Sequence, residues 1–133
     1  MKKHSLPRDE RITGKKSFSF VFDNGIPVSL PNGFLKLLFI FRGANDSLSP
    51  VRVGIAVSKR AGNAVWRNRV RRVVRESYRT NKPELLDHCN SKCVGINVVF
   101  IPYGFQKKFH PDVCLKDIEP LMRILLQKLI EKI

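Results

Sequence analysis

The sequence predicts a single α+β domain in which helices pack against one sheet. Short apolar runs of strand length alternate with segments whose apolar residues recur at helical spacing. Their order is helix, two or three strands, helix, strand and helix, which is typical of a two-layer α+β sandwich. The 133 residues fit one domain, and no internal repeat or long linker divides residues 1–133.

The first half of the chain contains one short helix and the first strands. Residues 17–24 predict a helix, because Phe18, Val21 and Phe22 share one face and Asn24-Gly25 is a stop signal. Residues 34–42 and 51–58 predict strands, separated by a turn-rich loop at 43–47. Residues 28–30 are either an additional strand or the start of the first.

The second half contains a long basic helix, a buried strand and a last helix. The basic helix is expected from near Asn63 to about Tyr78, with Pro83 blocking simple continuation. Residues 93–101 predict a buried strand because they are apolar, rich in β-branched residues and followed by Pro102. Residues 111–130 predict the last helix, which Pro120 would kink or split.

The charge points to an anionic partner. The chain has 25 Lys and Arg against 11 Asp and Glu, a net charge of +14, and residues 52–79 hold nine basic residues and one acid. Nucleic acid is the leading candidate, because neutralising phosphates releases counterions. An anionic membrane surface is the competing one. No signal peptide or membrane span is visible and the three cysteines are an odd number, so we expect a cytoplasmic protein with reduced thiols.

The basic helix has an apolar stripe and an arginine-rich face. Trp66, Val70, Val73, Val74 and Ser77 form the stripe. Acids that would intersperse a solvated face are almost absent, so this face suits an external polyanion, and RNA is the best candidate. Gly62-Asn63 relaxes the backbone for close approach to a phosphate, and the helix N-terminus adds positive potential there. The residues opposite the stripe are Asn68, Arg71, Arg72, Arg75 and Arg79, with Arg67 and Arg69 on the flanks.

Residues 57–72 resemble the signature of the bacterial ribonuclease P protein subunit. The hallmark is Arg67-Asn68-Arg69, preceded by a turn that reads Lys-Arg-Ala-Gly-Asn-Ala-Val at 59–65. Arg11-Ile12 and residues 18–25 are similar to the family's N-terminal segment and first helix, and residues 53–57 to the strand before the signature. The last 50 or so residues follow the family only in pattern.

The resemblance implies a fold and an activity. The fold is of order α-β-β-β-α-β-α, with a left-handed β-α-β crossover through the Arg-rich helix, although general topology rules favour the opposite hand. The activity is endonucleolytic removal of the 5′ leader from precursor tRNA. The chain would be a subunit of this endoribonuclease, with no catalytic residues of its own, because the partner RNA is the catalyst. Mg²⁺ would be bound mainly by that RNA and the substrate.

The resemblance also implies partners and sites. The partners are ribonuclease P RNA and precursor tRNA, with no membrane and no obligate protein partner. The aromatic leader cleft would contain Phe18, Phe22 and Phe34, whose rings can stack on single-stranded RNA. Leu37 stands at a strand position that is often aromatic in the family, which weakens stacking on the sheet. The RNA-binding residues would be Lys59, Arg60, Asn63, Arg67, Asn68, Arg69, Arg71, Arg72 and Arg75.

Two other functions stay open at this point. A general RNA-binding protein, such as a ribosomal protein or RNA chaperone, could share the basic helix. A metal-binding or membrane-surface module is the other, but the spacing of His88, Cys89, Cys93, His110 and Cys114 suits a zinc site poorly. The acids are scattered rather than clustered as a two-metal nuclease requires, so we predict neither a metal site nor a catalytic residue in the protein.

Overall fold

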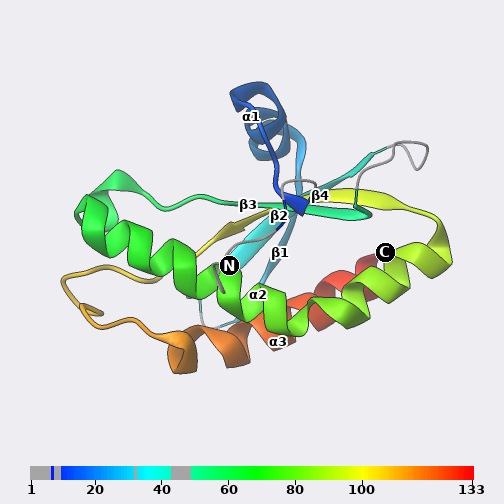
Figure 1. The fold of residues 1–133 in the computed structure, drawn as a ribbon. Coiled ribbons are helices and arrows are strands. Elements are labelled where there is room, and N and C mark those ends of the chain that lie inside the picture. The colour runs from blue at the N-terminus through cyan, green and yellow to red at the C-terminus, as the bar shows by residue number, and fades with distance from the viewer. Residues whose placement is uncertain (1–6, 8–9, 32, 43–48) are drawn as a thin grey trace.

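The computed structural model describes residue 7 and residues 10–31, 33–42 and 49–133 (Figure 1). The predicted order α-β-β-β-α-β-α is confirmed, and the segment 28–30 belongs to a separate first strand. The turn-rich loop predicted at 43–47 lies outside the described residues. The elements are α1 (Lys15–Asn24), β1 (Ile26–Ser29), β2 (Lys36–Arg42), β3 (Val51–Ile55), a 3₁₀ turn (Lys59–Ala61), α2 (Ala64–Lys92), β4 (Gly95–Ile101) and α3 (Leu115–Lys132).

The four strands form one sheet in the order β1-β2-β4-β3. The pairs β1–β2 and β2–β4 are antiparallel, whereas β3 and β4 are parallel, with Val53 opposite Val98. Parallel neighbours need a long connection, and α2 supplies it between β3 and β4. The edge strand β3 is therefore followed by the 3₁₀ turn and then by the basic helix α2.

The two faces of the sheet are covered differently. The helices α2 and α3 pack together on one face, over buried residues such as Leu37, Phe39, Val98 and Phe100 (Figure 1). The helix α1 lies alone across the opposite face and buries Val21 there (Figure 1). The sheet and the α2–α3 pair are thus the two main layers, and α1 leaves part of its face uncovered.

The helix α2 is longer than the sequence predicted. Pro83, which was expected to lie beyond its end, lies inside it. A proline removes one backbone hydrogen bond and crowds the preceding turn. In that turn the Asn81 amide donates to the Ser77 carbonyl at 2.7 Å, and the Thr80 hydroxyl donates to the Glu76 carbonyl at 3.2 Å. Beyond the proline Leu85 and Cys89 are fully buried, so packing stabilises the continuation of the helix.

The last helix begins later than predicted, at Leu115 instead of Pro111. Its first turn is fixed by Asp117, whose side chain accepts the Cys114 N–H at 2.9 Å. Pro120 lies inside α3 and does not split it, so of the two expected effects the split was wrong. The buried residues Ile118 and Met122 flank the proline and pack in the core. Within the described part of the chain, no helix has the length and apolar character needed to cross a membrane.

Candidate nucleic-acid interface

The turn before α2 fixes where the basic helix begins. The Ser58 hydroxyl accepts the Arg60 N–H at 3.2 Å, and the Asn63 side chain accepts the Trp66 N–H at 2.9 Å as the N-cap of the helix. A Cβ on Gly62 would lie 2.6 Å from the Trp66 ring, so this position requires glycine for packing. The structure thus gives Gly62 and the Asn63 oxygen a role at the start of the helix, and close approach of Gly62 to a phosphate stays a prediction.

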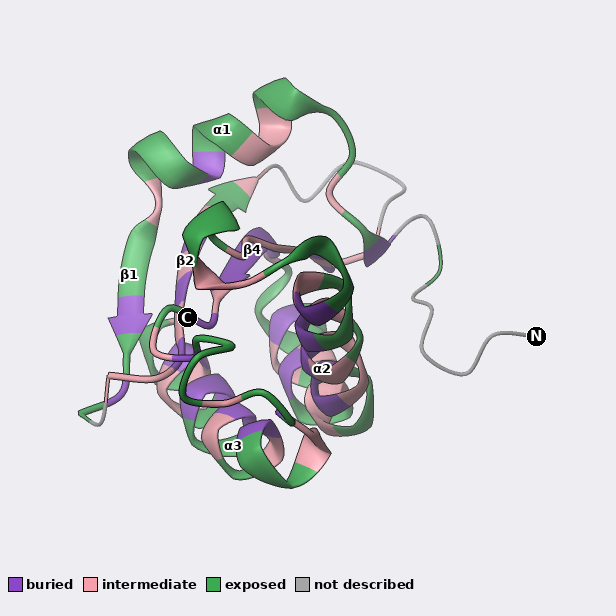
Figure 2. Cartoon of the chain, turned by 90° about the vertical axis from the view of Figure 1, so that its left-hand side faces the viewer, coloured by how far each residue is buried: buried purple, intermediate pink, exposed green. Residues whose placement is uncertain are grey.

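The buried side of α2 agrees with the predicted stripe. Trp66, Val70, Val74 and Ser77 are buried, and Figure 2 shows the buried residues of α2 turned inward and its exposed residues turned outward. Tyr78 also lies within α2 and is fully buried.

Away from the buried stripe, the arginine side chains of α2 differ in exposure. Arg69 and Arg72 are exposed, whereas Arg67, Arg71 and Arg75 are half-buried. Two of the side chains of this surface are paired within the helix. Arg71 donates to the Asn68 side chain at 2.9 Å, and Arg79 forms an ion pair with Glu76 at 2.6 Å. The charge of Arg79 is therefore partly neutralised, while the signature arginines extend toward two separate grooves.

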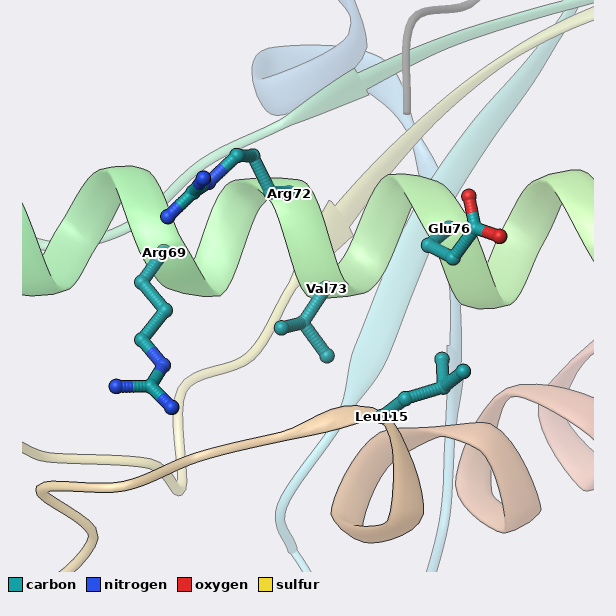
Figure 3. Close-up of a pocket in the computed structure, with 5 residues that line it drawn as sticks. All are labelled: Arg69, Arg72, Val73, Glu76 and Leu115. Atoms are coloured by element: carbon teal, nitrogen blue, oxygen red, sulfur yellow. The ribbon is translucent and has the colours of Figure 1, made fainter. Parts of the chain in front are cut away.

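The first groove lies between α2 and the start of α3 and encloses about 220 Å³. Figure 3 shows Arg69 directed toward the α3 side and Arg72 toward the other, with the apolar side chains of Val73 and Leu115 between the two helices. Glu76, which also lines this groove, is engaged by Arg79. The arrangement places two arginines of the signature around an apolar floor.

The second groove, here called the α1–α2 groove, lies over β3 and also encloses about 220 Å³. Phe18 forms its aromatic wall, and a Cβ on Gly54 would lie 2.7 Å from the Phe18 ring. The ring thus rests directly on the backbone of β3. The residues that line the groove are Arg11, Ile12, Phe18, Val53, Gly54, Ile55, Arg71 and Arg75.

The segment that carries Arg11 is fixed along the free edge of β3. Arg11 forms a β-bridge with Val53, and the Ile12 N–H donates to the Val53 carbonyl at 2.9 Å. Arg52 strengthens this attachment by donating to the Arg11 carbonyl at 2.7 Å. The guanidinium of Arg11 is thereby held on the same groove as Arg71 and Arg75, although the three residues come from distant parts of the sequence.

The α1–α2 groove concentrates positive charge. Burial, followed by the charges of Arg11 and then Arg71, lowers the pKa of Arg75 from its ordinary value. An arginine nevertheless stays protonated at neutral pH, so the groove contains mutually repelling guanidinium groups. None of the ion pairs between described residues involves these three arginines. A bound phosphate would relieve this repulsion, and arginine can donate two hydrogen bonds to it.

The three predicted cleft phenylalanines do not form a single cluster. The Phe18 and Phe22 ring centroids lie 5.4 Å apart, and Phe22 is 42% exposed. Phe34 instead packs against Phe105 at 5.2 Å and His110 at 5.7 Å, in the chain that follows β4. Phe34 precedes β2, so it extends past the end of the strand rather than over the centre of the sheet. The structure therefore gives Phe34 a packing role there.

The candidate metal-ligating residues are dispersed. Cys89 is buried in α2, Cys114 precedes α3, and His110 packs against Phe34 and Phe105. Burial raises the pKa of Cys89 to about 11, which keeps it a neutral thiol. No group of three or more His, Cys, Asp or Glu that could hold a metal ion occurs among the described residues.

Arg11 is the main site residue that the sequence pattern did not single out. Its sequence signals are the resemblance of Arg11-Ile12 to the family's N-terminal segment and the basic excess of the first 16 residues, which hold six basic residues and two acids. Pairing of Arg11 with β3 is a non-local contact that periodicity does not report.

Comparison with known proteins matches residues 6–125 to the family model described as Ribonuclease P. A ribonuclease P protein component from Clostridium novyi is 33% identical over 123 residues, covering 92% of this chain and 96% of that protein. One from Dictyoglomus thermophilum is 38% identical over 81 residues, so this chain spans 62% of that relative. The solved RNase P protein from Thermotoga maritima is 27% identical with a TM-score of 0.61, covering 93% of this chain and 97% of that one. This chain therefore belongs to the ribonuclease P protein family.

Proposed function

We propose that this chain is the protein subunit of a ribonuclease P ribonucleoprotein and acts in the cytoplasm. In this role it binds the catalytic RNA and the 5′ leader of precursor tRNA, and it promotes removal of the leader. The observation that carries the proposal is the α1–α2 groove, where one aromatic ring converges with three arginines that form no ion pair among the described residues. Such a combination suits a single-stranded RNA, because guanidinium groups bind phosphates and the ring stacks on a base.

The two sides of α2 would bind different RNAs. The leader would occupy the α1–α2 groove, where Arg71 and Arg75 face Arg11, with Phe22 extending the stacking surface beside Phe18. The catalytic RNA would contact the helix start and the opposite side of α2. The residues for that contact are Lys59, Arg60, Asn63, Arg67, Asn68, Arg69 and Arg72.

The protein contributes binding and positioning rather than chemistry. Its described residues provide no cluster of carboxylates, and His110 is packed among aromatic rings. When bound by the RNA and the substrate, Mg²⁺ would supply the metal-ion chemistry of phosphodiester hydrolysis. The arginines on this chain would neutralise phosphates nearby and so favour assembly of substrate and RNA at low Mg²⁺.

The direct test is reconstitution with a bacterial ribonuclease P RNA and precursor tRNA at low Mg²⁺. With this protein present, we expect faster cleavage and a product with the mature 5′ end. RNA binding without faster cleavage would indicate a general RNA-binding protein instead. In that case the basic helix would keep its role and the leader assignment would be abandoned.

A further inference from the structure

The chain between β4 and α3, residues 102–114, is rigidly attached to the start of α2. The Lys107 N–H donates to the Ala61 carbonyl at 2.8 Å, and the Trp66 indole donates to the His110 carbonyl at 2.9 Å. On the other side the Gly104 N–H donates to the Phe34 carbonyl at 3.1 Å. This segment, here called the β4–α3 loop, is thus held in a fixed position beside the 3₁₀ turn.

The β4–α3 loop has its own small core and leaves two aromatic rings outside it. Phe105 is buried and packs against Phe34 and His110 inside the loop. Tyr103 is 45% exposed and Phe109 is 66% exposed. An exposed ring on a firmly held loop is poorly explained by packing, because the loop's own core is complete without it. Single exposed rings are common on protein surfaces, so it is the charges around these two rings that point to a ligand.

Each exposed ring is accompanied by lysine. The Lys36 ammonium lies 4.8 Å from the Tyr103 ring centroid, and the Lys108 ammonium lies 5.1 Å from that of Phe109. Lys107 is exposed beside them, and the loop 102–114 holds one acid, the exposed Asp112. Stacking rings interleaved with cations are typical of surfaces that bind single-stranded nucleic acid.

The β4–α3 loop also lies next to the turn that precedes the basic helix. A cavity of about 260 Å³ separates the loop from the turn, with Ser58 and Arg60 on one side and Tyr103 and Gln106 on the other. Arg60 thus adds a guanidinium to the same surface. An RNA strand in contact with the start of α2 is therefore close to Tyr103 of the loop.

We propose that the β4–α3 loop is an additional RNA-binding surface that takes unpaired nucleotides. Phe109 and Tyr103 stack on bases, and Lys36, Lys107 and Lys108 neutralise the adjoining phosphates. The inference rests on the proposed function for its partner, and the unpaired nucleotides come from either the catalytic RNA or the precursor tRNA. A protein partner is disfavoured because the exposed rings stand among cations rather than in an apolar patch.

The test measures the affinity of the full-length chain for two RNAs separately. One arm is ribonuclease P RNA alone, and the other is precursor tRNA added to the assembled complex. Phe109→Ala is expected to lower the affinity in one arm by about fivefold or more. A loss in the first arm assigns the nucleotides to the catalytic RNA, and a loss confined to the second assigns them to the substrate. Phe109→Trp is expected to keep the affinity, and Phe109→Leu to lose it.

The lysines are tested through the salt dependence of binding. Replacing Lys107 and Lys108 with Gln is expected to reduce the slope of log affinity against log salt by about 1.4, as for two single-strand phosphate contacts. The matched control is Ile124→Ala on α3, because Ile124 is 51% exposed and lies on another surface. All variants are first checked for an unchanged unfolding midpoint.

The proposal is overturned if Phe109→Ala binds both RNAs as the unmodified chain does, or if Ile124→Ala loses as much affinity. Failure of the unmodified chain to stimulate cleavage is a separate result, which overturns the proposed function. A Phe109→Ala loss of RNA affinity would then still support the β4–α3 loop as an RNA-binding surface.

Discussion

Gly54 is the residue at which one methyl group would alter the α1–α2 groove most directly. The Gly54→Ala side chain would begin 2.7 Å from the Phe18 ring, which must move away. Because the ring can shift within the groove, we expect a modest loss of stability, about 1 kcal/mol. We expect a clear loss of precursor tRNA affinity, with affinity for the catalytic RNA retained. Equal loss in both binding assays would place Phe18 outside the leader site.

Phe22 tests the same groove without disturbing the sheet. The ring is 42% exposed beside Phe18, so Phe22→Leu removes an aromatic face at little structural cost. We expect weaker binding of precursor tRNA and unchanged binding of mature tRNA in the assembled complex. An equal loss for mature tRNA would refute the leader-cleft assignment of this residue.

Arg75 reports on the repulsion among the groove arginines. Burial and the neighbouring charges of Arg11 and Arg71 lower the pKa of Arg75. Arg75→Gln removes the charge that these two arginines repel. We expect RNA affinity to fall and the salt slope to decrease by about one. At low ionic strength the unfolding midpoint should not fall, since relief of repulsion offsets lost packing. A lower midpoint with unchanged affinity would instead identify Arg75 as a packing residue.

The helices and strands were predictable to different extents. The strand β4 was predicted well, because five of its seven residues are Ile, Val or Phe and a proline follows them, which leaves few alternatives. The end of α2 was predicted wrongly, because Pro83 is a strong local signal for termination. The helix continues because Leu85 and Cys89 are buried, and this tertiary contribution is absent from any local pattern.

The start of α2 makes an element-level prediction. Asn63 caps the helix through the Trp66 N–H, so Asn63→Ala should destabilise the protein by about 1 kcal/mol, whereas Asn63→Ser should retain most of the stability. Thermal unfolding followed by circular dichroism measures both variants. RNA binding well below the midpoint then separates the two roles of Asn63. Affinity lost in both variants would indicate an RNA contact, and affinity kept in both would leave only the cap.

At the scale of the whole molecule, the sequence predicted most of the basic residues of the site but not their arrangement. Periodicity placed the arginines of α2 opposite the apolar stripe and on its flanks, whereas the structure also shows that Arg69 and Arg72 line one groove and Arg71 and Arg75 another. The difference arises from non-local contacts. The segment that carries Arg11 pairs with β3, and α1 crosses the sheet so that Phe18 rests on Gly54. The family resemblance placed Phe34 in the cleft, whereas in the structure Phe34 precedes β2 and its ring packs against Phe105 and His110.

The net charge of the whole chain favours general RNA binding, from which specific binding has to be distinguished. A net charge of +14 favours any RNA at low salt, so affinity alone does not identify the substrate. The specific claim is that the α1–α2 groove recognises a single strand adjoining the tRNA. Such recognition appears as a difference in affinity between two RNAs that share the tRNA body and differ in the leader.

The most direct measurement is therefore the affinity of the assembled ribonucleoprotein for precursor tRNA and for mature tRNA, with and without this protein, at physiological salt. We predict that the protein strengthens binding of the precursor much more than that of mature tRNA, and that Gly54→Ala removes most of this difference. Equal strengthening of both RNAs by the unmodified chain would contradict the account, because the groove would then contribute charge without contacting the leader.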